Sequence, residues 1–127
     1  MKLIIMDSLD SLLQIIDDMQ KLDLDYETIS KINPRIIYIS LTGYGQNGVY
    51  AQEAGHDLNY IGRAGILDAT GHQNSKPTIP AVQIADIAGG SYSTLSACLL
   101  ALYQRERTGK GSYLDLSMLD ASLPFMS

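Results

Sequence analysis

The sequence predicts an α/β fold with parallel strands, because two strand-like runs lie on either side of a long helix-like segment. Residues 35–41 form a β-rich run with apolar residues on both faces, as in a strand covered on two sides. Residues 113–118 alternate in character and suit a final strand, before Asp120 opens another helix. Residues 86–107 are nearly continuously apolar and predict a buried helix that ends at Gly109. Strand, loop, helix and strand in this order are typical of such a domain.

Further helices are predicted before and between these elements. Over residues 8–22, apolar residues recur at three- and four-residue spacing with aspartates between them, which indicates an amphipathic helix. A short helix over 25–31 ends before Asn33-Pro34, because proline disfavours helical dihedral angles in the residue before it. Residues 46–80 are rich in Gly, Asn and Pro, so we expect a functional loop region with a short helix near 57–61.

The composition indicates one globular domain and excludes several classes of protein. The chain has 127 residues, of which 46% are hydrophobic and 18% charged. Its net charge of −5 counts against nucleic-acid binding, which needs a basic face. No apolar run approaches the ~18 residues of a membrane span and no leader pattern begins the chain, so we expect a cytoplasmic protein. The only cysteine, Cys98, offers neither a disulfide framework nor a cysteine metal site.

His56 is the first candidate for chemistry. It follows Gly55, which removes steric cover from one side, and it precedes Asp57, which places a carboxylate beside the imidazole. Histidine is poised near neutral pH for proton transfer. Alternatively, His56 caps a helix or fills a loop, and the residues alone leave both interpretations open.

Asp86 is the second candidate. It is the expected N-cap of the helix over 86–107, and aspartate is a preferred N-cap for structural reasons alone. Gly89 and Gly90 follow in the first turn, although each glycine weakens a helix by roughly 0.5–1 kcal/mol relative to alanine. We interpret the pair as room for something bound close to the backbone. The helix N-terminus would favour the charged form of Asp86, which would act as a base or a nucleophile.

Five short motifs also occur in a specific order. They are Asn33-Pro-Arg-Ile-Ile-Tyr38, Leu41-Thr-Gly-Tyr-Gly-Gln46, Ala54-Gly-His-Asp-Leu-Asn-Tyr60, Ala85-Asp-Ile-Ala-Gly-Gly90 and Arg105-Glu-Arg-Thr-Gly-Lys-Gly111. This set resembles the middle of family III coenzyme A transferases of the CaiB/BaiF type, and residues 55–60 resemble the α-methylacyl-CoA racemase branch. The resemblance implies that residues 1–127 are a central part of a Rossmann-like large domain, incomplete at both ends and without the family's small C-terminal domain. It also implies an interlocked homodimer.

The resemblance implies catalytic roles for the two candidates. In the racemase branch, the residues matching His56 and Asp86 exchange protons with the α-carbon of a 2-methylacyl-CoA. In the transferase branch, the aspartate matching Asp86 is the nucleophile that forms an acyl anhydride. A third interpretation is that the chain is a non-catalytic fragment that associates with a partner.

Other residues take supporting roles by the same resemblance. Asp57 would orient the loop, Gly89 and Gly90 would support the site, and Lys21 and Tyr60 would contact coenzyme A. Coenzyme A enters as part of the thioester substrate, with no tightly bound cofactor and no metal. Two segments depart from the family pattern and indicate an altered CoA-binding loop: Gln14-Ile-Ile-Asp-Asp18 and Leu22-Asp-Leu-Asp25.

Overall fold

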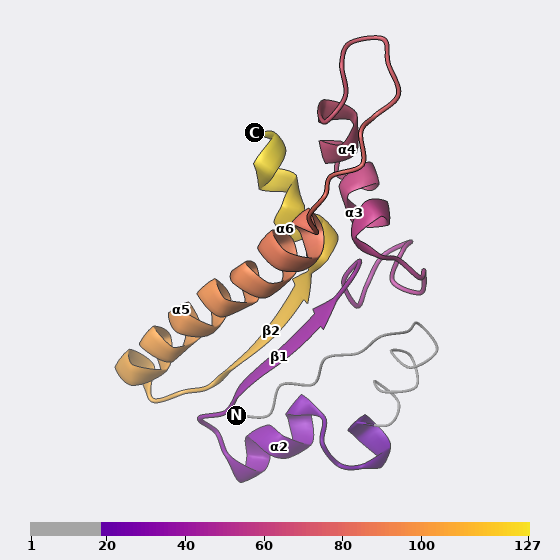
Figure 1. The fold of residues 1–127 in the computed structure, drawn as a ribbon. Helices are drawn as coiled ribbons and strands as arrows, with labels where there is room; N and C mark the ends of the chain where they lie inside the picture. Colours follow the sequence, from indigo (N-terminus) through magenta and orange to yellow (C-terminus); the bar gives the residue numbers. More distant parts are fainter. Residues whose placement is uncertain (1–18) are drawn as a thin grey trace.

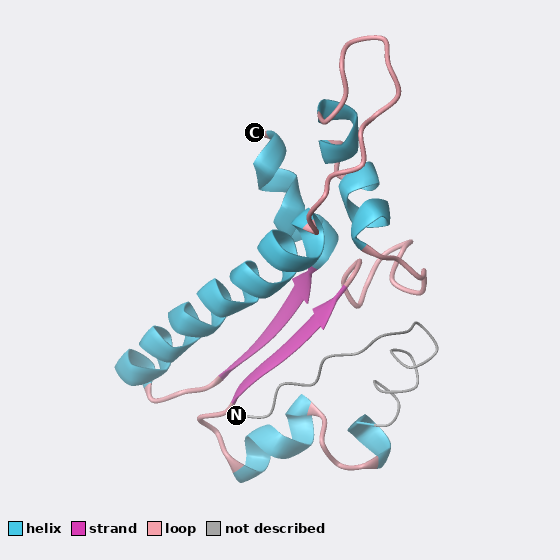
Figure 2. Ribbon diagram, in the orientation of Figure 1, coloured by secondary structure: helices cyan, strands magenta, loops and turns pink. Residues whose placement is uncertain are grey.

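The computed structural model describes residues 19–127 (Figure 1). The helix predicted over 8–22 lies outside the described residues except for its end, where 19–21 form a helical turn. The elements follow in the order α2 (Tyr26–Ile32), β1 (Ile37–Thr42), α3 (Asp57–Arg63), α4 (Ile66–Ala69), η1 (Ala85–Tyr92), α5 (Ser93–Thr108), β2 (Ser112–Ser117), α6 (Met118–Ser122) and η2 (Leu123–Met126). This alternation of strands and helices confirms the predicted α/β class (Figure 2).

β1 and β2 pair side by side as parallel strands, as predicted. The register begins with Ile37 opposite Ser112. α5 is the last part of the connection between the strands and runs along the sheet, in contact with both strands (Figure 1). α2 lies on the side away from α5, where Tyr26 stacks on Tyr113 with the ring centroids 5.2 Å apart. The sheet is therefore held between one long helix and one short one.

Local sequence signals explain most element boundaries. Asp25 caps α2, because its Oδ1 accepts a hydrogen bond of 3.0 Å from the N–H of Thr28. α5 ends where Gly109 takes the left-handed conformation, with φ of 73°, as the sequence predicted. The side chain of Ser117 accepts from the N–H of Asp120, so α6 begins at Met118, before Asp120 and earlier than predicted.

The main buried cluster lies beyond the carboxyl ends of the strands. Its members come from the loop after β1, from α3 and α4, and from the segment that enters η1. They are Tyr44, Tyr60, Ile61, Ala64, Ile66 and Ala85. Met118 and Leu119 of α6 pack against this cluster. Its residues border the two segments that carry His56 and Asp86.

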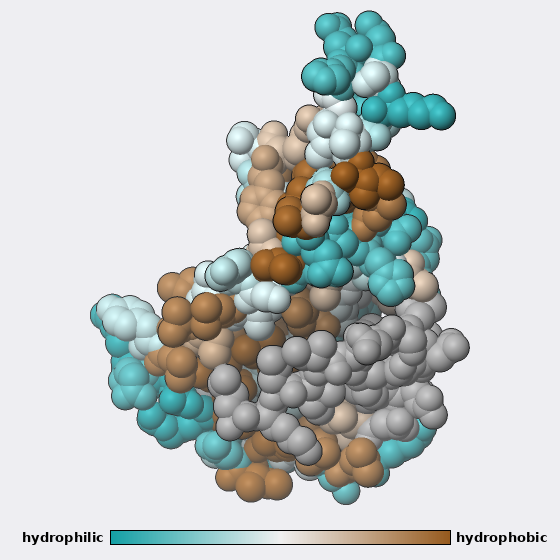
Figure 3. Space-filling model, in the orientation of Figure 1, coloured by the Kyte–Doolittle hydropathy of each residue, from teal (hydrophilic) through white to brown (hydrophobic). Residues whose placement is uncertain are grey.

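α5 is less buried than the sequence predicted. Ala101 is the only buried residue within it. Large apolar or aromatic side chains are exposed along η1 and α5: Ile87, Tyr92, Leu95, Leu99, Leu100 and Tyr103. Part of the surface over α5 is brown in Figure 3. The prediction of a buried helix is therefore wrong for the described residues. None of the helices in residues 19–127 is long and apolar enough to cross a membrane.

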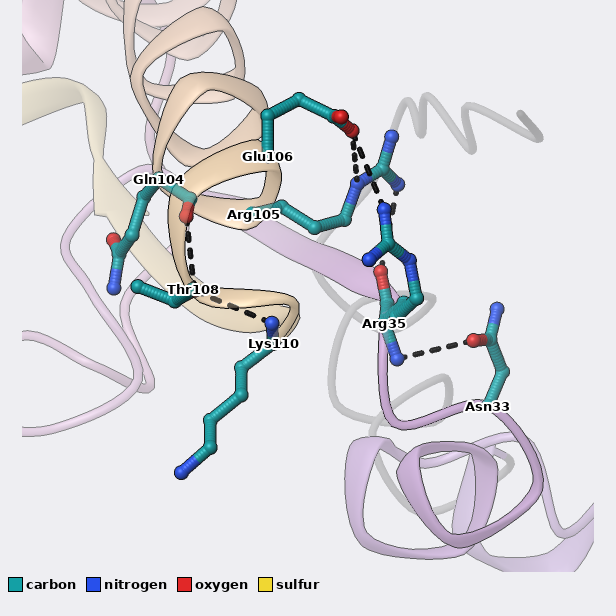
Figure 4. Close-up of polar contacts among 7 residues, drawn as sticks. All are labelled: Asn33, Arg35, Gln104, Arg105, Glu106, Thr108 and Lys110. Carbon is teal, nitrogen blue, oxygen red and sulfur yellow. Dashed lines mark hydrogen bonds and ion pairs between the residues drawn. The ribbon is translucent and has the colours of Figure 1, made fainter.

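Polar contacts join the C-terminal end of α5 to the start of β1 (Figure 4). Arg35 forms an ion pair of 3.3 Å with Glu106, and the Nη1 of Arg105 donates to the carbonyl oxygen of Arg35 at 3.4 Å. The two ion-paired side chains are more than half exposed, and exposed pairs contribute about 1 kcal/mol or less. These contacts align the strand with the helix end and add little stability.

Replacing Gly89 should disrupt the packing of η1 on α6. A Cβ atom at Gly89 would collide with Ser122 Oγ and would lie 2.8 Å from the carbonyl oxygen of Met118. Gly89→Ala should therefore lower the free energy of unfolding by about 1–3 kcal/mol, as overpacking does. Urea denaturation measures this change.

Gly62→Ala is the matched control, because a Cβ there would approach nothing closer than 3.9 Å. In the helix α3 this change should be neutral or stabilise by up to about 1 kcal/mol. Equal effects of the two substitutions would contradict the close packing of η1 on α6.

Candidate active site

His56 lies at the start of α3, at the end of the loop that follows β1. Its backbone N–H donates to Asn59 Oδ1 at 3.0 Å, which fixes the first turn of the helix. The residue is the N-cap of α3, so the helix-cap interpretation is confirmed for its position. It is also exposed, so the imidazole is not packed into the core of the described residues. The cap position and a role in proton transfer are therefore compatible.

Two tyrosines fix the chain immediately before His56. The hydroxyl of Tyr60 donates to the carbonyl oxygen of Gly55 at 2.6 Å, and its ring meets that of Tyr44 edge-on. A Cβ atom at Gly55 would lie 2.6 Å from the Tyr60 ring and 2.8 Å from the Tyr44 hydroxyl, so a side chain does not fit. Burial, with the nearby Tyr44 and Asp86, raises the pKa of Tyr60 to about 12. Tyr60 is 6% exposed and serves packing, and its contact with coenzyme A stays a prediction.

Asp57 connects the start of α3 to the start of η1. Its Oδ1 accepts a hydrogen bond of 3.0 Å from the backbone N–H of Asp86. Both aspartates are partly buried, where a hydrogen bond to a charged group is stronger than in water. This contact places the helix that begins after His56 beside the helix that carries Asp86.

Asp86 lies inside η1 and does not cap it. η1 begins at Ala85, and Ile84 before it already has helical dihedral angles, so the predicted N-cap role is wrong. η1 is a π-helix, a form with i→i+5 hydrogen bonds that is frequent at functional sites. Burial raises the pKa of the Asp86 carboxyl and the charge of Asp57 adds to this, whereas His56 lowers it. The pKa of Asp86 is therefore shifted in the direction opposite to the one that we expected from a helix N-terminus.

The glycines after Asp86 serve the packing of α6. The space beside Gly89 is filled by Ser122 and by the backbone of Met118. A Cβ atom at Gly90 would lie 3.4 Å from the Met118 side chain. The interpretation of this pair as room for a ligand is therefore wrong on the side that faces α6.

Lys21 is not brought together with the other predicted site residues. The helical turn at 19–21 lies beside α2, well away from α3 and η1 (Figure 1). The contact of Lys21 with coenzyme A stays a prediction. In the described part of the chain, no group of three His, Cys, Asp or Glu side chains is placed to hold a metal ion.

The sequence analysis did not single out Arg63, the last residue of α3. Its guanidinium carbon lies 3.8 Å from the centroid of the Tyr50 ring, and it forms an ion pair of 2.5 Å with Glu53. The signal in the sequence is weak, because an arginine in the last turn of a helix is common for electrostatic reasons alone.

Comparison with known proteins identifies the family. Residues 15–127 match the sequence profile described as CoA-transferase family III. The chain belongs to this family. Alpha-methylacyl-CoA racemase of Homo sapiens is 39% identical over 104 residues, which are 82% of this chain and 27% of that protein. Succinate–glutarate CoA-transferase of Agrobacterium fabrum is 41% identical over 104 residues, which are 82% of this chain and 26% of that protein.

Solved structures of the family share the fold described above. The crystal structure of a CAIB/BAIF family protein from Brucella suis matches with a TM-score of 0.79 at 40% identity, over 88% of this chain and 29% of that one. The predicted resemblance to family III is therefore confirmed. Racemases and transferases match at similar identity, so the comparisons do not separate the two branches. The chain spans about a quarter of the length of these relatives.

Asp86→Asn should stabilise the chain at neutral pH. Burial and Asp57 raise the pKa of Asp86 in the folded state above its ordinary value of 3.8, so the charged form is disfavoured by folding. The stability difference between the variant and the wild type should shrink as the pH falls through the folded-state pKa, and it should vanish below about 3.8, where both states are protonated.

Thermal unfolding followed between pH 7 and pH 3 measures this difference. Asp68→Asn is the matched control, because Asp68 is an exposed aspartate of α4. A variant Asp86→Asn that is less stable than the wild type at neutral pH would contradict the assigned environment of Asp86.

Proposed function

We propose that the protein to which this chain belongs is an acyl-CoA racemase, which transfers the α-proton of a 2-methylacyl-CoA thioester. The observation that carries the proposal is the closeness of the two helix starts that carry His56 and Asp86. The helix starts that carry them are joined by the 3.0 Å hydrogen bond from the Asp86 N–H to Asp57, and His56 is close enough to lower the pKa of Asp86. An imidazole and a carboxyl group in one site are the two acid/base groups that inversion at a carbon requires.

The proposed reaction uses one group on each face of the substrate. Neutral His56 takes the α-proton from one enantiomer, and the electron pair of the C–H bond moves into the thioester carbonyl to give an enolate. Protonated Asp86 then gives its proton to the opposite face of the α-carbon. The other enantiomer reacts in the reverse direction, with Asp86 as the base. The raised pKa of Asp86 supports this role, because it makes the carboxylate a stronger base and the carboxyl group easier to hold protonated.

The negative charge on the thioester oxygen requires hydrogen-bond donors. The N–H of Asp86 does not serve, since it donates to Asp57. The first N–H groups of any helix have no acceptor within the helix, so we assign this role to the N–H groups that follow Asp86 in η1. In this assignment the segment that carries one base also stabilises the enolate.

Transfer of coenzyme A between carboxylic acids is the second candidate. The similarity to a succinate–glutarate CoA-transferase favours it. Asp86 would then attack the thioester carbonyl, form an acyl anhydride and release the thiolate of coenzyme A, with His56 uninvolved. The interlocked homodimer and the cytoplasmic location stay predictions in either case.

Exchange of the α-proton with solvent deuterium tests the racemase. The whole protein that contains this chain should incorporate deuterium from the solvent into both enantiomers of a 2-methylacyl-CoA. His56→Ala and Asp86→Asn should each lower racemisation by about 10²–10⁴-fold, the usual effect of losing a general base. Each variant should retain exchange with one enantiomer only, and the two should differ in which one. Mass spectrometry of the recovered enantiomers measures both quantities.

His72→Ala, which removes an exposed loop histidine, is the matched control and should keep full activity. Racemisation within a few-fold of the wild type in His56→Ala would contradict the racemase. In that case hydroxylamine trapping of an acyl group on Asp86, during incubation with an acyl-CoA, would support the transferase.

A further inference from the structure

Arg63 makes three contacts with the loop that carries His56. Its guanidinium carbon lies 3.8 Å from the Tyr50 ring centroid and 5.3 Å from that of Tyr44. Its Nη2 donates to Glu53 Oε2 at 2.5 Å. Arg63 is the last residue of α3, and all three partners lie in the segment between β1 and α3.

These contacts continue to His56 through the packed tyrosines. Tyr44 meets Tyr50 with ring centroids 5.8 Å apart, and it meets Tyr60 at 5.0 Å. Tyr44 and Tyr60 together enclose Gly55, the residue before His56. Arg63 therefore holds the loop around Tyr50 and Glu53, and the buried tyrosines hold its end at Gly55.

We propose that Arg63 is a positioning residue, which fixes the loop before α3 and thereby the orientation of the His56 side chain. This inference rests on the proposed racemase function. α3 begins immediately after His56 and ends at Arg63, so one rigid helix sets the distance between the contacts of Arg63 and the proton-transferring residue. Without Arg63, the loop before α3 loses the only cation that the described residues place over Tyr44 and Tyr50.

The chemistry of the contact requires arginine in particular. The planar guanidinium stacks on an aromatic ring and pairs with a carboxylate at the same time, whereas the ammonium group of lysine offers a point charge only. An exposed ion pair alone would hold the loop weakly, and the Arg63 and Glu53 side chains are 36% and 45% exposed. The two tyrosine rings are what make the contact specific.

Substitution at Arg63 tests the loop independently of activity. In Arg63→Met the backbone amides of residues 45–55 should exchange hydrogen for deuterium about tenfold faster or more, because the loop opens locally. The NMR signals of the His56 imidazole should shift. Arg63→Lys should give an intermediate rate, and Glu53→Gln, which leaves α3 intact, should loosen the same segment less. Arg107→Met is the matched control, because it removes an arginine that lies 5.6 Å from a tyrosine ring centroid on α5.

The catalytic readout then separates positioning from general destabilisation. Arg63→Met should lower α-proton exchange on the His56 side about tenfold or more, because small misplacements of a catalytic group are costly. Exchange on the Asp86 side and the KM for the acyl-CoA should stay within about twofold. Unchanged amide exchange in residues 45–55, or an equal loss on both sides, would overturn the proposal. If the wild-type protein exchanges no α-proton, the racemase assignment fails, and the amide rates and imidazole signals still decide whether Arg63 fixes the loop.

Discussion

The hydrogen bond from the Asp86 N–H to Asp57 is the contact on which the candidate site depends. It joins residues that are 29 positions apart and closes the segment formed by α3, α4 and the long loop after them. The two helix starts that it joins come from opposite ends of this segment. Removing the acceptor would leave a partly buried N–H without a partner, a costly state for any backbone group. Asp57 thus sets how His56 and Asp86 lie relative to each other, because it follows His56 in the chain and accepts the hydrogen bond from Asp86.

Close contacts at glycines determine how the loop before α3 packs on Tyr60 and how η1 packs on α6. Tyr60 lies against both Gly43 and Gly55, and any side chain at either glycine would collide with its ring or hydroxyl. Gly89 approaches α6 as closely. The buried cluster beyond the strand ends therefore relies on backbone that approaches aromatic rings and a neighbouring helix directly. Such contacts are stiff, which suits a site in which two groups must keep a fixed separation.

The sequence predicts the elements well wherever a local signal decides them. The strands follow from β-propensity, their parallel pairing from the order strand, helix and strand, and the stop at Gly109 from turn chemistry. The short helix after His56 also lies where it was predicted. The N-cap role of Asp86 could not be excluded from the sequence. An aspartate followed by an apolar run gives the same sequence pattern whether it precedes a helix or lies in its first turn.

Features that depend on distant neighbours were not predictable. The pair Gly89 and Gly90 shows in the sequence that two side chains are absent, but not what occupies the space beside them. In the structure α6 occupies it. The contacts of Arg63 likewise lie outside its own helix, and an apolar run alone does not show which of its side chains stay exposed, as those of α5 do. The π-helical form of η1 has a further consequence for how the site can vary. Each residue of an α-helix turns the chain by about 100°, so a π-helical segment places Asp86 in a different angular phase from α5. Converting η1 to α-helical geometry would therefore change the direction of the Asp86 side chain relative to α5.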